Sequence, residues 1–557
     1  MLIGMNPTQT MFLLPEQAPG FHGAGGPPKA MLVAPQGGNN IVTGIGLFTG
    51  SVNSRAIGAK WMAGKDSMMN DVRFLGGHGT SLPAGFGGSR GNIYNNNHTA
   101  DTDLNKRWDV QHYSLWITSG GGGTFKDIWT PDTFAQAGIY ISDTSTEGRM
   151  YQVSIEHHVR NEVKLRNVHN WFIYSMQTEE ERGEGPEALP LEIADSSDIT
   201  FANLFMYRVI STATPSPYAI KITDSKNIHF RNLHCYSGSK YAFDNSIYDE
   251  THGAVVRARE IAALDVSGNP PNRAAARVSP VLAPGAKVEK LAGGFSNATG
   301  AAVDPAGNVF FVDPRWQRIF RWSADTRAVR MERDNALDPV NLGFDKAGNL
   351  LVVSDTGTVY AFKPGSSEDQ ITYLEAQAAA PRPGAMALLA ANRRRDAHDF
   401  WQDSTQAKPY HYLSPDGTVF IPVGRDFKGQ STAPGGYRNV DITRTFSLAP
   451  AKPGVPFYVA DEYDMRTYSF QVGPDGTLSQ PKLFANAGGT GAAADAQGNV
   501  YVAQDQILVF DASGKQIDTI DVPERPGSIV FGGKDGQTLF IAARTSVYAV
   551  RTKFKGR

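Results

Sequence analysis

Apolar and polar residues alternate along two stretches of the first half, 191–204 and 220–233, which begin 29 residues apart. Each stretch holds two short segments with a period of two, the spacing of a strand with one buried face. An Asp-Ser pair, which favours a turn, separates the two segments. Residues 163–168 repeat the strand pattern. A strand–turn–strand unit with a recurring period of this length predicts a solenoid.

Equivalent positions in the two copies indicate which solenoid this is. Ile199 and Ile228 fall in the inward phase, and Asn203 and Asn232 occupy matched positions four residues later. Because equivalent residues of successive coils stack, we expect the two asparagines to form an amide ladder. The pattern predicts an all-β chain in which residues 1–265 form a right-handed parallel β-helix.

A different repeat fills the second half. Residues 266–290 are rich in Pro, Ala and Gly, which predicts a linker. Beyond it, a short strand, an Asp-x-x-Gly-Asn turn and a second apolar strand recur, most clearly at 299–313, 341–353 and 490–503. Such units are typical of propeller blades. We predict a six-bladed β-propeller over residues 291–557.

Composition narrows the classes of partner. The 557 residues carry 53 Lys and Arg against 55 Asp and Glu, so no basic field would attract nucleic acid or an anionic membrane. We expect a neutral polysaccharide or oligosaccharide as partner. The one cysteine, Cys235, lies in an alternating apolar run, which favours a buried structural thiol over a nucleophile.

The first residues show neither a signal peptide nor a long apolar span. An extracellular or periplasmic location would therefore require a signal on a missing upstream segment. Residues 1–60 hold many apolar positions without a capping helix before them, and solenoid ends need caps. We accordingly expect an upstream segment, forming a first β-helix.

The densest polar clusters of the first half are 156–158 and 177–182, separated by one strand pair. Stacked coils lie about 4.8 Å apart, so Glu156 and Glu179 can become lateral neighbours. Two close carboxylates do not both ionise readily, which gives one of them the raised pKa that a general acid needs. The alternative is a solvated acidic turn with its histidines in a loop.

The stretch 138–179 resembles the second β-helix of family 55 glycoside hydrolases, the β-1,3-glucanases. In that family a Glu-His motif precedes a Gln-Thr-Glu motif by the 23-residue interval that separates Glu156 from Glu179 here. The resemblance implies that Glu179 is the general acid of an inverting hydrolysis, that Glu156 tunes its proton and that Gln177 orients sugar hydroxyls.

Three further residues are candidates for substrate contact, namely His157, Trp129 and Arg182. Trp129 falls where the family has a tryptophan-bearing strand. Residues 180–183 replace the aromatic segment that forms the family's sugar platform, so we expect no aromatic stacking from them.

The second half resembles the SMP-30/gluconolactonase group, most plainly at 525–542. That group holds one divalent cation through a Glu, an Asn and an Asp at blade starts. Here Thr299 and Thr490 stand where carboxylates are needed, and Asn341 is one place out of register. We therefore expect no metal and no other cofactor.

The leading hypothesis is a carbohydrate-active enzyme, a glycoside hydrolase on a β-glucan-type polysaccharide with an accessory propeller. The alternatives are a non-catalytic glycan-binding protein and a propeller lactonase. A polysaccharide lyase would need clustered Asp with Ca²⁺ or a basic catalytic residue, and the sequence shows no such Asp cluster.

Overall fold

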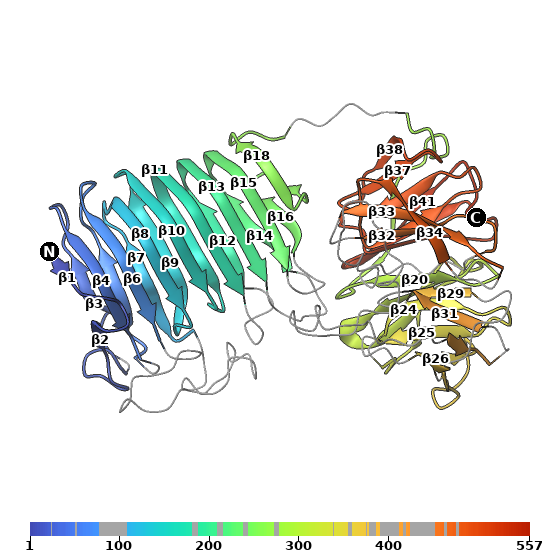
Figure 1. Cartoon of the computed structure of the whole chain (residues 1–557), viewed down its shortest axis with the longest axis horizontal. Helices are drawn as coiled ribbons and strands as arrows, with labels where there is room; N and C mark the ends of the chain where they lie inside the picture. The colour runs from blue at the N-terminus through green and yellow to red at the C-terminus, as the bar shows by residue number, and fades with distance from the viewer. Residues whose placement is uncertain are drawn as a thin grey trace. The chain divides into compact units, whose positions relative to one another are not determined.

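The computed structural model describes residues 1–23, 25–50, 53–76, 109–180, 188–208, 216–237, 243–271, 278–337, 339–354, 359–374, 376–377, 386–389, 411–415, 419–423, 452–461, 465–474 and 478–557. The chain divides into two compact units, Met1–Ala274 and Ala275–Arg557. Within the described residues, every regular element is a strand except one 3-10 helix, η1 (Pro314–Trp316). This confirms the predicted all-β class (Figure 1).

Unit 1 is a β-helix of two parallel sheets. The first sheet contains β1 (Leu2–Ile3), β2 (Met11–Leu13), β4 (Ile41–Phe48), β6 (Met68–Leu75), β8 (Gly123–Pro131), β10 (Gly148–Glu156), the end of β11 (Asn161–Glu180), β13 (Ser197–Arg208) and β15 (Lys226–Ser237). The second contains β3 (Lys29–Ala34), β5 (Ala56–Trp61), β7 (Gln111–Ile117), β9 (Ala135–Thr144), the start of β11, β12 (Leu189–Ala194), β14 (Ser216–Thr223) and β16 (Phe243–Asp249). Two antiparallel strands, β17 (Ala254–Val256) and β18 (Glu260–Val266), pair with β16 and β15 and end the parallel stacking.

The interior of the β-helix is a continuous apolar stack. Ile199 and Phe201 pair in register with Ile228 and Phe230, and all four are fully buried. The Phe201 and Phe230 rings stack with centroids 5.4 Å apart. Cys235 lies in the same core, and burial raises the pKa of its thiol to about 12, so it is structural rather than reactive.

The predicted asparagine ladder is present. Asn232 Nδ2 donates to Asn203 Oδ1 at 2.8 Å, and both residues have positive φ, 57° and 54°. Asn adopts this left-handed conformation more readily than other non-glycine residues. The side chain therefore serves two purposes, since it permits the bend in each coil and ties neighbouring coils together.

Replacing Asn232 by alanine should lower the free energy of unfolding of the β-helix by about 1–2 kcal/mol, because both the ladder hydrogen bond and the tolerance of positive φ are lost. Asn232→Gly should recover the conformational part only. Urea denaturation measures the change, and Asn269→Ala, at an exposed position without positive φ, is the control. Equal losses at 232 and 269 would contradict the ladder's contribution.

Unit 2 consists of small sheets, five of them antiparallel. Their strands are β19 (Glu289–Gly293) with β39 (Ser528–Gly532), β40 (Thr538–Ala543) and β41 (Ser546–Arg551); β20 (Thr299–Val303), β21 (Val309–Asp313), β22 (Arg318–Trp322) and β23 (Val329–Arg333); β24 (Pro339–Phe344), β25 (Leu350–Ser354), β26 (Val359–Phe362) and β27 (Thr372–Leu374); β32 (Phe457–Asp461), β33 (Arg466–Val472) and β34 (Leu478–Ala485); and β35 (Gly491–Ala494), β36 (Val500–Ala503), β37 (Ile507–Phe510) and β38 (Gln516–Ile520). A sixth, mixed sheet contains β28 (Ala376–Gln377), β29 (Met386–Leu389), β30 (His411–Leu413) and β31 (Val419–Val423).

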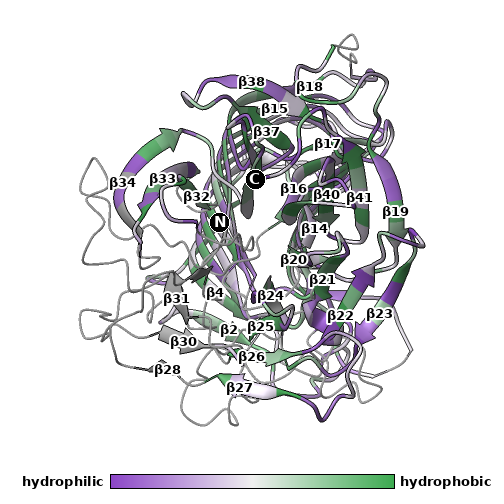
Figure 2. Cartoon of the chain, turned by 90° about the vertical axis from the view of Figure 1, so that its right-hand side faces the viewer, coloured by the Kyte–Doolittle hydropathy of each residue, from purple (hydrophilic) through white to green (hydrophobic). Residues whose placement is uncertain are grey.

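These sheets are the blades of a β-propeller, which confirms the predicted fold class. The last blade is completed by β19 from the start of the unit, which pairs antiparallel with β41. Figure 2 shows β21, β40 and β41 as largely hydrophobic and the outer strands β22 and β23 as largely hydrophilic, as expected when each blade buries its middle against its neighbours.

The repeated Asp-x-x-Gly-Asn turn has one geometry in three blades. The carboxylate of the Asp accepts hydrogen bonds from the backbone N and the Nδ2 of the Asn, at 2.6–2.9 Å, in the pairs Asp304–Asn308, Asp345–Asn349 and Asp495–Asn499. The intervening glycine has φ between 82° and 89° in all three turns. The sequence repeat therefore encodes the hairpin between the first two strands of a blade.

The segment between the repeats already belongs in part to unit 2. The unit boundary falls between residues 274 and 275, inside the predicted linker 266–290. Val281 is 1% exposed in the propeller core, and Leu282 forms a bridge with Thr552.

Candidate functional site

The two carboxylates singled out by the sequence lie side by side on the first sheet of the β-helix. Strands β10 and β11 run parallel, and Glu156 pairs in register with Glu179, as Ser154 does with Gln177. Parallel strands lie about 4.8 Å apart, so both acids present their side chains at one place on the outer face. The Glu179 side chain is 20% exposed.

Each carboxylate is held by a polar side chain two residues before it. Ser154 Oγ donates to Glu156 Oε1 at 2.5 Å, and Gln177 Nε2 donates to Glu179 Oε2 at 3.0 Å. Since residues i and i+2 of a strand share a face, the alternation that builds the strand also places these donors. The donor to Glu179 is the glutamine that the sequence assigns to sugar binding.

A histidine and an aspartate complete the cluster. His157 Nδ1 lies 2.6 Å from Asp132 Oδ1, and its Nε2 lies 4.0 Å from Glu179 Oε1. The backbone N of His157 donates to the carbonyl of Glu179 at 2.9 Å. The imidazole is therefore positioned against the second carboxylate by a buried Asp, a geometry suited to moving or holding a proton.

Sequence reasoning missed Asp132, although the coil period contains the signal. Pro131 pairs in register with Glu156, so the next residue of each strand end, Asp132 and His157, come together. Both have positive φ, 53° and 66°, as the chain leaves the sheet.

Beneath the cluster lies a second, fully buried histidine. His158 Nδ1 is 2.6 Å from Glu162 Oε2, and its Nε2 is 2.8 Å from Thr133 Oγ1. Glu162 also accepts the His158 backbone N–H at 2.9 Å, so it fixes the turn that carries His157. Burial lowers the pKa of His158 to about 3 and raises that of Glu162 well above its usual range.

The buried imidazole of His158 should make the free energy of unfolding of the β-helix depend on pH. The folded state keeps His158 neutral down to pH about 3, whereas the unfolded chain takes up the proton near pH 6.5. The part of the free energy of unfolding that depends on a neutral His158 is therefore fully present above pH 6.5 and is lost as the pH falls toward 3. The loss is on the order of 3 kcal/mol between pH 7 and pH 4. Denaturant titrations at both values should show a smaller pH dependence for His158→Gln; an unchanged dependence would refute a neutral His158.

A buried ion pair lies on the next positions of the same strands. Glu180, which directly follows the site carboxylate, pairs in register with Arg208, and Nε of the arginine lies 3.6 Å from Oε2 of the glutamate. The two side chains are 0% and 1% exposed. Burial raises the pKa of Glu180, an effect that the guanidinium opposes.

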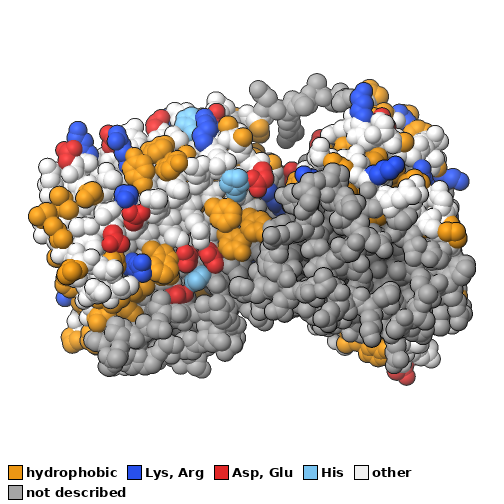
Figure 3. Space-filling view, in the orientation of Figure 1, with side chains coloured by type: hydrophobic (Ala, Val, Ile, Leu, Met, Phe, Trp, Pro, Cys, Tyr) orange, Lys and Arg blue, Asp and Glu red, His pale blue; other side chains and the backbone are white. Residues whose placement is uncertain are grey.

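Aromatic side chains border the carboxylates on the adjacent coils. Glu179 pairs in register with Tyr207, which pairs with Tyr236. The two tyrosine rings stack with centroids 5.4 Å apart and planes at 6°, and Phe205, 38% exposed, lies 5.6 Å from Tyr207. Figure 3 shows acidic and histidine side chains beside hydrophobic ones on this face of the β-helix.

The aromatic faces beside Glu179 come from the two coils that follow it in the β-helix. The sequence signal is the coil length, since Tyr207 follows Glu179 by 28 residues and Tyr236 follows Tyr207 by 29.

Of the two remaining predicted substrate residues, one lies on the strand beside the cluster and the other outside the described part of the chain. Trp129 is half-buried on β8, in register with Ser154, and the Arg73 guanidinium lies 4.8 Å from its ring centroid. Arg182 falls outside the described residues.

At the blade starts of unit 2, the three positions compared above with the cation-binding residues of the SMP-30/gluconolactonase group carry no carboxylate. Thr299 and Asn341 are buried, and Thr490 Oγ1 donates to the carbonyl of Pro526 at 3.1 Å. Asn341 Oδ1 accepts the Leu342 backbone N–H, whereas its buried Nδ2 has no partner. A dication needs anionic oxygen ligands, so this set does not fit one. Over the described residues as a whole, no group of three or more His, Cys, Asp or Glu could hold a metal ion.

Comparison with known proteins bears on unit 2. Residues 439–545 match the sequence profile of the SMP-30/Gluconolactonase/LRE-like region. Unit 2 is thus a β-propeller that contains a stretch similar to this family. The match agrees with the blades described above and with the resemblance seen in residues 525–542.

Solved structures with similarity to the chain include a structural-genomics target with a provisional gluconolactonase assignment (19% identity, 50% of this chain and 97% of that one, TM-score 0.37). A gluconolactonase from Xanthomonas campestris (17%, 48% and 89%, 0.32) and the calcium-binding protein regucalcin from Agrobacterium tumefaciens (15%, 48% and 94%, 0.35) are also similar. No curated protein matches the chain.

None of these findings supports the resemblance of the β-helix to family 55 glycoside hydrolases, which stays a prediction. In the described parts of both units, no helix is long and apolar enough to cross a membrane.

Proposed function

We propose that the β-helix hydrolyses glycosidic bonds of a neutral, β-glucan-type polysaccharide at the outer face of β10 and β11. The observation that carries this proposal is the in-register pair Glu156 and Glu179, with the Asp132–His157 pair against the second acid. Glycoside hydrolases use a pair of carboxyl groups, one of which protonates the glycosidic oxygen.

Glu179 is the general acid in this proposal. It gives its proton to the leaving oxygen as the bond to the anomeric carbon breaks. Water adds to that carbon and releases one proton, which His157 accepts. His157, held by Asp132, is placed to return a proton to Glu179 after the bond is cleaved. Gln177 keeps the carboxyl oriented through its hydrogen bond to Oε2.

The spacing between β10 and β11 limits the role that Glu156 can have in hydrolysis. An inverting pair needs about 6.5–9.5 Å between its carboxyl groups to admit the attacking water, whereas adjacent parallel strands lie about 4.8 Å apart. Glu156 therefore acts on the proton of its neighbour rather than on the water. Tyr207, Tyr236 and Phe205 bind the sugar ring beside the cleaved bond.

The direct test is reducing-sugar release from a panel of β-1,3-, β-1,4- and mixed-linkage glucans by the full chain. Release from at least one glucan supports the proposal. Binding of glucans without release, measured by affinity electrophoresis, would instead favour a non-catalytic glycan-binding β-helix.

Lactone hydrolysis by the propeller is a second candidate, favoured by the family match at residues 439–545. The comparisons support this function better than the first one, and the β-helix geometry supports the first. Hydrolysis of glucono-δ-lactone, followed by a pH indicator, tests it. Lactone hydrolysis that persists in Glu179→Gln would place this activity in unit 2. If the chain hydrolysed no lactone of a panel of sugar lactones, the lactonase function would be excluded.

Because Thr299, Asn341 and Thr490 offer no carboxylate, we make a separate prediction about metal binding. We expect EDTA and added Ca²⁺ or Zn²⁺ to leave the thermal transition of the propeller unchanged, because a bound dication would stabilise the folded state by mass action. An EDTA-sensitive transition would show that other residues complete a metal site.

A further inference from the structure

A cavity opens at the end of the propeller where the innermost strands finish. Its walls include the last residues of β20, β24 and β35 and the first of β32, and its volume is roughly 220 Å³. Thr299 and Val303 stand at opposite ends of β20, which at about 3.3 Å per residue puts the cavity some 13 Å from the blade starts. It is therefore distinct from any lactonase site at those starts.

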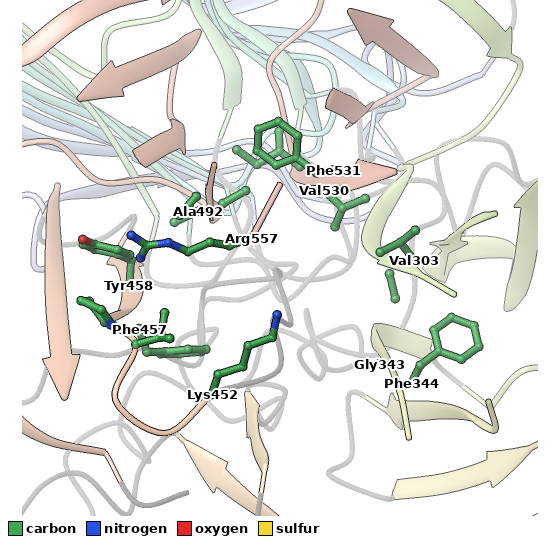
Figure 4. Close-up of a pocket in the computed structure, with 16 residues that line it drawn as sticks. Val303, Gly343, Phe344, Lys452, Phe457, Tyr458, Ala492, Val530, Phe531 and Arg557 are labelled. Carbon is green, nitrogen blue, oxygen red and sulfur yellow. The ribbon is translucent and has the colours of Figure 1, made fainter. Parts of the chain in front are cut away.

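The walls are apolar, with two cationic side chains among them. Phe344, Phe457, Val530 and Phe531 line the cavity together with the small side chains of Ala492, Ala493 and Ala494. Lys452 and Arg557 are the charged members, and the described lining contains no Asp or Glu. Figure 4 shows the Lys452 ammonium directed into the cavity and the Arg557 side chain extending across it toward Tyr458.

Neither cation has a carboxylate partner within the described residues. Lys534 pairs with Asp325 at 2.7 Å and Arg525 with Asp505 at 2.8 Å, whereas no ion pair involves Lys452 or Arg557. Both side chains are exposed, so the carboxylate of a ligand can reach their charges.

Backbone hydrogen bonds hold the main chain at both cationic residues. Arg557 N donates to the carbonyl of Ala494 at 3.0 Å, and Gly556 N to that of Gly536 at 2.9 Å. A Cβ at Gly556 would lie 2.3 Å from Phe531 Cβ, so only glycine permits this approach. Lys452 begins a turn closed by the Val455 N–H donating to its carbonyl at 3.0 Å.

Tyr458 adds a polar group beside the guanidinium. The Arg557 side chain extends toward the phenol (Figure 4), whose hydroxyl can donate to a ligand acceptor. Burial raises the pKa of Tyr458, and the neighbouring guanidinium partly opposes this, so the hydroxyl stays a donor at neutral pH.

We propose that this cavity binds a small organic carboxylate with a ring or short chain as its apolar body. The carboxylate lies between Lys452, Arg557 and the Tyr458 hydroxyl, and the body packs on the phenylalanine and alanine walls. An apolar cavity of about 150 Å³ holds one benzene molecule, so the volume here fits an aromatic ring with a short acid chain.

The test uses phenylacetate as probe and phenylacetamide as its neutral counterpart, with binding measured by calorimetry and saturation-transfer NMR on the full chain. We expect saturable phenylacetate binding that is at least about tenfold tighter than that of the amide, and a loss of about tenfold or more in Lys452→Met and in Arg557→Met. Lys534→Met removes one charge elsewhere on the propeller and should leave binding unchanged.

Circular dichroism melting shows whether each variant is folded, and Tyr458→Phe, which removes only the hydroxyl, provides a milder variant. Equal binding of acid and amide, no saturable binding of phenylacetate, or an equal effect of Lys534→Met and Lys452→Met would each overturn the proposal. Lactone hydrolysis and glucan hydrolysis are measured separately, so their outcome does not decide this one.

Discussion

Glu179→Gln should lower glucan hydrolysis by about 10²–10⁴-fold, because the amide keeps the shape of the side chain but has no proton to donate. Gln177 Nε2 can still donate to the remaining amide oxygen, and the side chain is partly exposed. We therefore expect the melting temperature to stay nearly the same. Reducing-sugar release under substrate saturation, with the melting curve beside it, measures both quantities.

Glu147→Gln is the matched control, since Glu147 lies exposed on the same unit in an ion pair with Arg149. It should keep full activity. If Glu179→Gln hydrolysed glucans as fast as the wild type, the acid would have to be sought elsewhere and the proposed site would fall. An Asp132→Asn variant should lower the rate less, with a changed pH profile, since Asp132 acts through His157.

Arg208→Met should destabilise the β-helix by about 3–5 kcal/mol, because it leaves Glu180 buried without its cation. Arg208 also packs over the Phe243 ring at 5.6 Å, a contact that methionine partly retains. Differential scanning calorimetry would follow the β-helix transition. The loss should shrink as the pH falls, because a protonated Glu180 no longer needs a cation.

The double variant Glu180→Gln, Arg208→Met is the control for this effect. Removing both charges together often costs little, since the desolvation of both ions is avoided. We expect it to be more stable than Arg208→Met alone. If the single and double variants lost the same stability, the effect would come from packing around residue 208 and not from the unpaired acid.

Much of the fold could be predicted from local pattern. The alternation over 191–204 and 220–233 gave both the strands and their register, because a parallel coil of fixed length puts equivalent residues on top of each other. The asparagine ladder followed from the same repeat. In the propeller, the Asp-x-x-Gly-Asn turn predicted the hairpins that the structure contains.

The site could be predicted only in part. The sequence paired Glu156 with Glu179 because both end a strand one coil apart, and the register agrees. The Asp132–His157 contact was missed, because both residues lie just beyond the strand ends, although the coil period places those ends side by side. The charged cavity of the propeller was also missed, because Lys452 and Arg557 are 105 residues apart in the sequence.

The sequence by itself therefore determined the two architectures, the coil register and the position of the carboxylate pair, all of which depend on short-range periodicity. Only the tertiary structure decided that the Tyr207 and Tyr236 rings stack, that Glu180 is buried against Arg208, and that two cations without an ion pair among the described residues share one cavity. These features depend on which side chains meet across coils and blades. A one-dimensional pattern specifies which face a residue occupies, but burial and charge pairing are set by neighbours that only the folded chain brings together.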